Sequence, residues 1–140
     1  MSTSPMSIRV DDELLALVQA DAKAQTTTVS GVVQTLLWEA LRSRIVPGIV
    51  FRRGPSGRRP GVLGGPDVWE IVVALQGTEE RGDQAIANVA DELGLTQGQV
   101  SAALDYYSHW PDEIDAWITD NQRASDEAFL AWQTRQSILA

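Results

Sequence analysis

The spacing of apolar residues predicts different elements in three successive segments. Residues 6–10 alternate apolar and polar side chains, which is the period of a β-strand with one buried face. Acidic residues 11–13 then favour the first turn of a helix, because carboxylates interact favourably with the positive end of its dipole. A second helix is expected after the β-branched stretch 26–29, with Ser30 as its N-cap. The expected buried faces are Leu14, Leu17, Val18 and Ala22 in the first helix and Val33, Leu36, Leu37, Ala40 and Leu41 in the second.

A single five-residue strand is not stable alone, so its expected partner is the same strand of a second chain. This strand–helix–helix order resembles the ribbon-helix-helix family of bacterial DNA-binding proteins, over about 38 of the 140 residues. The resemblance implies an intertwined dimer whose antiparallel β-ribbon enters the major groove of DNA. Ser7 and Arg9 would then face the bases, and the amides of Thr28, Val29 and Ser30 would hold a phosphate. Arg9 can donate two hydrogen bonds to guanine. The alternative is a module that only dimerises.

The second segment, residues 45–66, is rich in glycine and proline and predicts turns. Residues 49–51 and 62–63 are expected to be short strands of a hairpin. Its tip would carry Arg52, Arg53, Arg58 and Arg59, which can contact a DNA backbone or a partner, or can simply be solvated. A nucleotide-binding P-loop is excluded here, because no Gly-Lys-Ser/Thr sequence is present.

The third segment, from Asp67 onward, has helical spacing throughout. Ala90, Gly94 and Val100 have the spacing of a helix-turn-helix, with a small residue, a turn glycine and a β-branched core residue. Thr96 and Gln99 predict a capping box for the next helix, whose expected apolar face is Val100, Ala103, Leu104 and Tyr107. That helix, residues 97–108, has no lysine or arginine, which favours a structural or protein-binding role over base recognition.

The end of the chain predicts further helix. Pro111 suits a helix first turn, and Ile114, Trp117 and Ile118 form the expected apolar face. In the tail, residues 124–140, Phe129 and Trp132 lie on one side of a predicted amphipathic helix. They either bind a partner or pack back on the domain or across a dimer.

A second resemblance covers roughly residues 45–121. It is carried by residues 48–52, 57–60 and 64–70, the Tyr106-Tyr107 pair and the Asp-Glu-Ile-Asp run at 112–115. These resemble a domain-of-unknown-function family with a helix-turn-helix core that occurs in VapB-type antitoxins. The resemblance implies an antitoxin that neutralises a PIN-like ribonuclease toxin and represses its own operon. Arg123 or Arg135 would then pair with the toxin's acidic metal site, beside Phe129 and Trp132.

Charge is distributed unevenly along the chain, whose formal net charge is −8. Residues 1–60 hold eight basic and five acidic residues, whereas residues 61–140 hold three basic and fourteen acidic residues. This asymmetry suggests a polyanion as partner for the first part and a basic protein for the second, or an acidic solvated surface in the latter.

Composition argues against an enzyme. There is no cysteine and one histidine, His109, which we expect to be a packing residue. The acids Asp112, Glu113 and Asp115 are more typical of a helix first turn than of a metal or catalytic site. No metal or cofactor is therefore expected. The lack of cysteine, of a long apolar run and of a signal-peptide pattern favours a soluble cytoplasmic protein.

The sequence thus predicts a mainly α protein in three parts. Residues 1–44 form a ribbon-helix-helix with a dimeric β-ribbon, residues 45–121 a helix-turn-helix-like domain with a Gly/Pro/Arg-rich hairpin, and residues 122–140 a helical toxin-binding tail. The expected partners are double-stranded operator DNA, a PIN-like toxin and a second copy of the chain, in a homodimer or higher assembly. Two alternatives are a free-standing dimeric transcriptional regulator without a toxin and a scaffold that binds no DNA.

Overall fold

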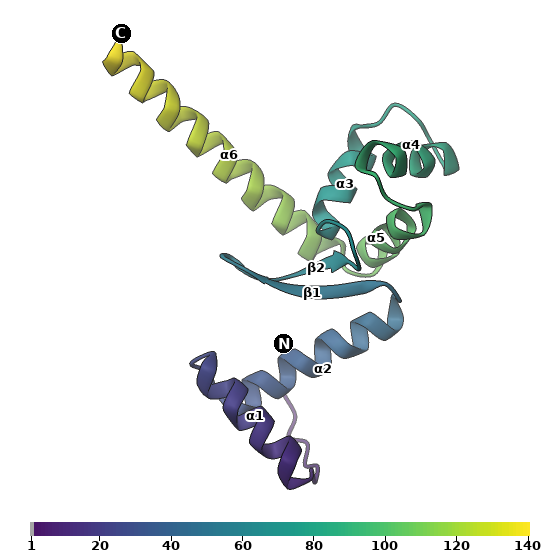
Figure 1. The fold of residues 1–140 in the computed structure, drawn as a ribbon, viewed down its shortest axis with the longest axis vertical. Coiled ribbons are helices and arrows are strands. Elements are labelled where there is room, and N and C mark those ends of the chain that lie inside the picture. The colour runs from purple at the N-terminus through teal and green to yellow at the C-terminus, as the bar shows by residue number, and fades with distance from the viewer. Residues whose placement is uncertain (1) are drawn as a thin grey trace. The chain divides into compact units, whose positions relative to one another are not determined.

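The structure is a computed structural model that describes residues 2–140. It is mainly helical, with one two-stranded antiparallel sheet (Figure 1). The chain separates into an N-terminal unit, Met1–Leu41, and a C-terminal unit, Arg42–Ala140. This division lies three residues before the expected boundary at residue 44, inside a helix. The six helices and two strands of the described residues are α1 (Asp12–Ala24), α2 (Val29–Ile45), β1 (Ile49–Gly54), β2 (Gly57–Val62), α3 (Val68–Gly77), α4 (Asp83–Leu93), α5 (Gln97–His109) and α6 (Pro111–Leu139).

The N-terminal unit contains α1 and most of α2. The Asp11 carboxylate accepts a hydrogen bond of 2.8 Å from the Leu14 amide, which caps α1 at the position that the acidic run predicts. The turn after α1 includes Thr26 with φ of 54°, a left-handed conformation that is uncommon for a β-branched residue. The predicted break between two helices at the β-branched stretch is therefore confirmed.

The N-terminal unit differs from the sequence prediction in two ways. Residues 6–10 are not a strand in the single chain, where β1 and β2 pair with each other, and the pairing of residues 6–10 with a second chain stays a prediction. The predicted apolar faces of α1 and α2 are also largely open to solvent. Of the residues expected to be buried there, Ala22 alone is buried, whereas Leu17 is 62% exposed and Leu41 is 51% exposed.

The C-terminal unit has a core of its own, to which both strands and all four remaining helices contribute. The core residues are Val46, Ile49, Val62, Val68, Ile71, Val72, Val89, Ala90, Val100, Ala103, Tyr106 and Ile114. The order of these elements follows local signals that the sequence contains. Gly94 ends α4 with φ of 67°, and Thr96 and Gln99 form the predicted capping box of α5.

The buried face of α5 is not the predicted one. Val100 and Ala103 are buried as expected, but the third core residue is Tyr106, while Leu104 is exposed and Tyr107 only partly buried. The core therefore follows the spacing i, i+3, i+6 along α5, and the larger ring of Tyr106 fills the space against Trp110 and Phe51.

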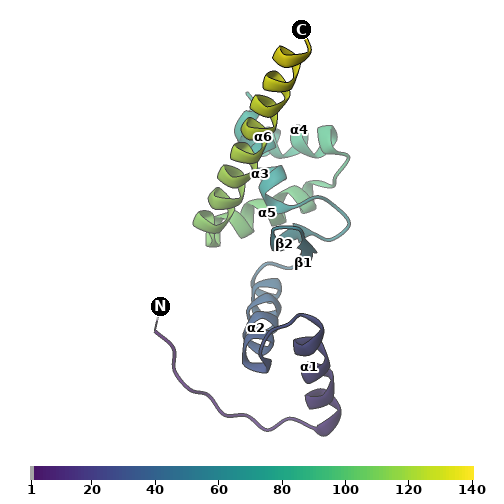
Figure 2. The same ribbon diagram turned by 90° about the vertical axis from the view of Figure 1, so that its left-hand side faces the viewer.

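Helix α6 is one continuous helix that starts with Pro111 in its first turn, as predicted. Its first part packs on the core through Ile114, which is buried, and through Trp117 and Ile118. Figure 1 shows its second half projecting away from α3, α4 and α5, and in Figure 2 its C-terminal end extends beyond them. The boundary expected between residues 121 and 122 thus falls within α6. None of the helices among residues 2–140 is long and apolar enough to cross a membrane.

Candidate functional site

The N-terminal unit presents an apolar groove between its two helices and the segment before α1. Ser7 and Arg9 lie in that segment, and both are exposed. The apolar residues that alternate with them point in part toward the groove, since Ile8 and Val10 line it together with residues of both helices. The complete lining is Ile8, Val10, Leu14, Leu15, Val18, Val29, Val33, Leu36, Leu37 and Ala40. A groove that is open to solvent and lined only by apolar residues is typical of a surface that binds a partner, because exposed apolar area is unfavourable in water.

The start of α2 is capped by Thr28 and not by Ser30, which corrects the sequence prediction. The Thr28 hydroxyl accepts a hydrogen bond of 3.0 Å from the Gly31 amide, and α2 begins one residue before Ser30, at Val29. The hydroxyl of a cap must precede the amides that it serves, and Thr28 is the residue at that distance. Thr28, Val29 and Ser30 are all exposed, so the structure places the three residues together at the N-terminus of α2.

The hairpin carries its arginines along the strands and not at its tip. Arg52 pairs with Arg59 and Arg53 with Arg58 across β1 and β2, and residues 55 and 56 form the turn. Because directly opposite residues of an antiparallel pair share a face, the four arginines form two pairs on opposite faces. Both strands are longer than the sequence predicts, and this extension is what includes the arginines in them.

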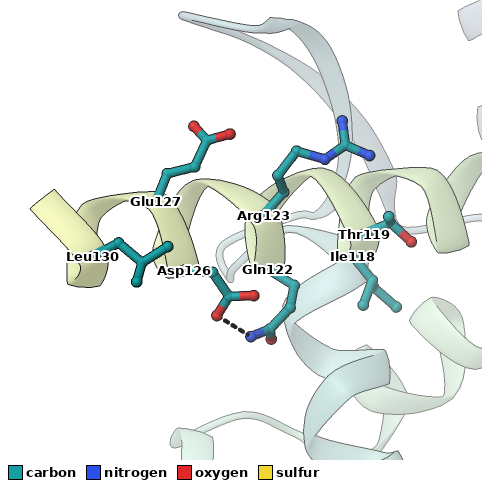
Figure 3. A pocket seen from close by; sticks show the side chains of 7 residues that line it. All are labelled: Ile118, Thr119, Gln122, Arg123, Asp126, Glu127 and Leu130. Carbon is teal, nitrogen blue, oxygen red and sulfur yellow. Dashed lines mark hydrogen bonds between the residues drawn. The ribbon is translucent and has the colours of Figure 1, made fainter.

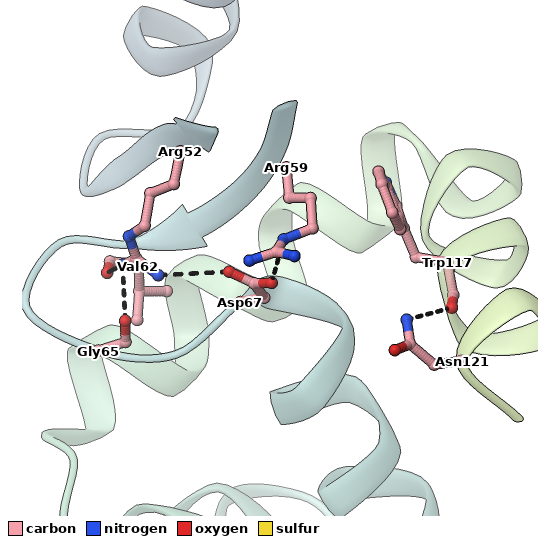
Figure 4. A network of polar contacts seen from close by, with 7 residues as sticks. All are labelled: Arg52, Arg59, Val62, Gly65, Asp67, Trp117 and Asn121. Carbon is pink, nitrogen blue, oxygen red and sulfur yellow. Dashed lines mark hydrogen bonds and ion pairs between the residues drawn. The ribbon is translucent and has the colours of Figure 1, made fainter. Parts of the chain in front are cut away.

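Arg52 and Arg59 both contact the carboxylate of Asp67 in an internal polar network (Figure 4). Arg52 Nη1 lies 3.3 Å from one Asp67 carboxylate oxygen, and Arg59 Nε lies 2.7 Å from the other. The Arg59 contact is an ion pair without hydrogen-bond geometry, because its N–H does not point at the carboxylate. Arg52 also donates to the carbonyl oxygens of Val62 and Gly65. These contacts tie the hairpin to the loop before α3.

Asp67 acts as a counter-charge and not as a side-chain cap of α3. It occupies the N-cap position of α3 but makes no capping hydrogen bond with its side chain. Only 5% of the residue is exposed, and its carboxylate neutralises the two arginines instead. A buried carboxylate requires such partners, since an unpaired buried charge is costly.

Two glycines make room for these guanidinium groups. A Cβ atom on Gly61 would lie 2.6 Å from Arg52 Nη1, and one on Gly54 would lie 2.5 Å from Arg59 Nη1. Both distances are below any normal contact, so each guanidinium lies directly over a glycine of the opposite strand. The glycine-arginine pattern of the hairpin is thus explained by packing, with the guanidinium groups of Arg52 and Arg59 engaged within the fold. Their contact with DNA stays a prediction, which these internal contacts do not favour.

Arg53 and Arg58 occupy the other face of the hairpin, and both are exposed. The Arg58 guanidinium also donates a hydrogen bond of 3.4 Å to the Phe51 carbonyl. Of the four predicted arginines, these two present charge at the surface.

A polar cluster that the sequence analysis did not predict lies where α2, α5 and α6 meet. Arg42 donates to the Tyr106 hydroxyl at 2.9 Å and to the Glu113 carboxylate, and Tyr106 donates to Glu113 at 2.7 Å. The Arg42 guanidinium also lies 4.7 Å from the centre of the Trp110 ring. Burial raises the pKa of Tyr106, and its hydrogen bond to Glu113 raises it further. Burial alone would lower the pKa of Arg42, but the contacts with Glu113 and Tyr106 raise it overall.

The same region explains the acidic run at the start of α6. Glu113 belongs to the cluster just described, and Asp115 accepts a hydrogen bond of 2.9 Å from the Tyr107 hydroxyl. Tyr106 is therefore hydrogen-bonded to Glu113 and Tyr107 to Asp115, a pairing that the separate sequence motifs did not indicate. Across residues 2–140 no group of three metal-ligating side chains comes together. His109 is exposed, and its Nδ1 lies 2.9 Å from the Asp105 carbonyl oxygen.

The first turn of α5 is occupied by internal contacts. Gln99 accepts a hydrogen bond from the Thr96 amide through Oε1 and donates one to the Leu63 carbonyl through Nε2, both at 2.9 Å. Gln99 therefore links α5 to the loop after β2.

The projecting half of α6 carries the predicted toxin-binding residues. Phe129 and Trp132 are each 56% exposed, and their rings stack with centroids 6.0 Å apart. They do not pack back on the domain. Arg123 forms an exposed ion pair of 3.9 Å with Asp120, and Arg135 is exposed. The four residues thus share one exposed helical segment.

A hollow also runs along α6, but it is not an enclosed site. Its seven lining residues all come from this one helix, between Ile118 and Leu130 (Figure 3). Gln122 donates a hydrogen bond of 3.1 Å to Asp126 there. A single helix provides only one wall, so this surface can hold a small molecule only when another chain covers it.

No family model, curated protein or solved structure matches the chain.

Proposed function

We propose that this chain is the antitoxin of a type II toxin-antitoxin system, acting as a homodimer in the cytoplasm. It binds operator DNA to repress its own operon, and it neutralises a PIN-like ribonuclease toxin. The observation that carries the proposal is the open apolar groove of the N-terminal unit beside an unpaired alternating segment.

A second copy of the chain fits this groove best. Residues 6–10 need a strand partner for their backbone groups, and the same segment of a second chain supplies one in a symmetric antiparallel pair. Forming that ribbon would also bury Met6 and Ile8, which are 72% and 62% exposed in the single chain. Dimerisation would thus give the backbone of residues 6–10 hydrogen-bond partners and cover their apolar side chains at the same time.

The dimer would present Ser7 and Arg9 of both chains on the outer face of the ribbon. Base contacts would come from these side chains, and the N-terminus of α2 at Thr28, Val29 and Ser30 would hold a backbone phosphate. The N-terminal unit has two basic and five acidic residues, so the few cations that it has must act locally.

We assign the α4–Gly94–α5 arrangement to a helix-turn-helix with a structural or protein-binding role. The use of Gln99 for capping and for its contact with Leu63 supports this assignment. The absence of lysine and arginine from α5 supports it as well.

We assign toxin binding to the projecting half of α6. A helix that exposes a stacked aromatic pair offers the anchors that helix-in-groove interfaces use. Arg123 and Arg135 are placed on the same segment, where either can reach an acidic site of the toxin.

Co-expression with the adjacent open reading frame tests the toxin assignment. We expect a complex that co-elutes in size-exclusion chromatography with light scattering and that relieves growth arrest. The double variant Phe129→Ala/Trp132→Ala should lose the complex while keeping its melting temperature, because both side chains are exposed. Leu130→Ala removes an equally exposed apolar group next to this pair and serves as the matched control. A dimer that binds no neighbouring gene product would favour the free-standing regulator instead.

Binding to the chain's own promoter tests the DNA assignment. Arg9→Ala should weaken promoter binding while light scattering still reports a dimer. Unchanged binding in this variant would move base recognition away from the N-terminal segment, and a lack of any salt-sensitive binding would favour the scaffold alternative.

A further inference from the structure

The turn of the hairpin and α6 form a pocket that the proposed function does not yet use. Its volume is about 330 Å³, and it is lined by Ser56 of the turn and by Trp117, Asp120, Asn121 and Ala124 of α6. The four α6 residues lie at positions i, i+3, i+4 and i+7, so they share one face of the helix. Trp117 and Asn121 are partly buried, whereas the other three lining residues are exposed, so the pocket is open to solvent.

The groups in this pocket suit a cation. Asn121 uses its amide nitrogen to donate a hydrogen bond of 2.8 Å to the Trp117 carbonyl, which leaves its amide oxygen as an acceptor (Figure 4). Asp120 is the one charged residue among the described lining residues, and the Ser56 hydroxyl can also accept a hydrogen bond. Trp117 adds an indole ring, which attracts guanidinium and ammonium groups.

Asp120 is held only weakly by its neighbour on α6. Its carboxylate lies 3.9 Å from Arg123 Nη1, which is beyond hydrogen-bond distance, and the two side chains are 65% and 66% exposed. An exposed pair of this kind contributes little to stability, so a cation that enters the pocket can replace Arg123 at Asp120. Arg123 would then be available to an acidic group of a partner.

We infer that this pocket receives an arginine or lysine side chain of the protein that binds the projecting half of α6. The inference rests on the proposed toxin binding and names a contact within it. Trp132 lies eight residues after Ala124, which is about 12 Å along the helix and about 80° around its axis. One partner surface can therefore contact the pocket and the aromatic pair together.

Two observations favour a partner's side chain over a free small cation. Helix α6 has six acidic and two basic residues, which complements a basic protein surface. A pocket with three exposed lining residues covers little of a free ligand, whereas a side chain is positioned by the rest of the bound protein.

The first test uses the complex of the full-length chain with the product of the adjacent open reading frame. Asp120→Asn removes the charge with little change of shape and should raise the Kd of the complex about tenfold in titration calorimetry. Asp91→Asn removes an exposed carboxylate of α4, outside the pocket, and is the matched control. Neither variant should change the melting temperature, because both side chains are exposed.

The second test needs no partner protein. N-acetylargininamide should shift the Trp117 indole N–H signal in NMR spectra of the full-length chain, and its neutral analogue N-acetylcitrullinamide should not. This signal is assigned by its absence from the Trp117→Phe variant. The shift should disappear in Asp120→Asn and remain in Asp91→Asn.

The outcomes separate this inference from the proposed function. A wild-type complex that forms while N-acetylargininamide leaves the Trp117 signal unchanged would overturn the inference alone. The same holds if Asp120→Asn and Asp91→Asn bind the partner equally well, and an arginine-dependent shift in that case would assign the pocket to a free small cation. A wild-type chain that forms no complex would overturn the proposed toxin binding and this inference with it.

Discussion

Arg42 in the last turn of α2 donates a hydrogen bond of 2.9 Å to the hydroxyl of Tyr106 in α5, 64 positions later in the chain. The same hydroxyl donates a hydrogen bond to Glu113 of α6. One phenol group therefore joins three helices of the C-terminal unit, at the point where α2 enters it.

Removing this hydroxyl should be costly. Tyr106→Phe keeps the buried ring but deprives Arg42 and Glu113 of a shared partner, so we expect the free energy of unfolding to fall by about 1–2 kcal/mol. Urea unfolding followed by circular dichroism measures this free energy. Tyr107→Phe is the matched control: its hydroxyl bonds to Asp115 at the exposed surface, and its removal should cost less than about 0.5 kcal/mol. Equal losses in the two variants would contradict a special role for Tyr106.

The stability of the fold should decrease at alkaline pH. Burial raises the pKa of Tyr106 above its ordinary value of about 10, so the hydroxyl ionises more readily in the unfolded chain than in the folded one. Its contribution to stability is complete below about pH 10 and is lost as the pH rises further. In a Tyr107→Phe background, the tyrosinate absorbance of folded protein reports Tyr106 alone. A midpoint at the ordinary value while the protein remains folded would contradict this prediction.

Asp67 should be required for the hairpin to keep its place. Asp67→Asn leaves the arginine pair of the internal network without a counter-charge at a position that is only 5% exposed. We expect a loss of about 1–3 kcal/mol, less than for a fully buried pair because the two arginine side chains are 34% and 27% exposed. The exposed Asp105→Asn substitution is the control for charge alone. High salt should remove only part of the difference in unfolding free energy between the Asp67→Asn and Asp105→Asn variants.

Gly61 should tolerate no side chain without cost. Gly61→Ala would place a methyl group 2.6 Å from Arg52 Nη1 and force the guanidinium off Asp67, with an expected loss of about 1–2 kcal/mol in thermal or urea unfolding. Gly77→Ala is the control, since nothing lies within 4 Å of the added atom there. If both alanines leave stability unchanged, the close approach of Arg52 to Gly61 does not constrain the hairpin.

Local signals in the sequence predict most of the helical framework. Four of these signals act within four residues of the chain and are confirmed by the structure. They are the acidic run at the start of α1, the β-branched stretch between α1 and α2, Gly94 after α4, and the capping box of Thr96 and Gln99. The sequence assigns the cap of α2 two residues too late because Thr28 and Ser30 are both good caps, and only the backbone geometry distinguishes them. Spacing alone favours Tyr107, at i+7 from Val100, and the choice of Tyr106 as core residue depends on its contacts with Phe51 and Trp110.

The functional surfaces depend on contacts that sequence spacing does not reveal. The four hairpin arginines look alike in the sequence, and their separation into an internal and an exposed pair requires the strand register and the position of Asp67. The predicted apolar faces of α1 and α2 are largely exposed in the single chain, and their burial against a second copy stays a prediction.

The sequence alone predicts most helix ends, with the start of α2 as the exception, because caps, turns and dipole interactions are short-range. It also determined which residues are apolar enough to need burial. The three-dimensional contacts show that Arg42, Arg52 and Arg59 form ion pairs within the fold, and that Arg53 and Arg58 are exposed at the surface. The physical reason is that neutralising a buried charge depends on partners brought together from distant positions, such as Arg42 and Glu113, 71 residues apart.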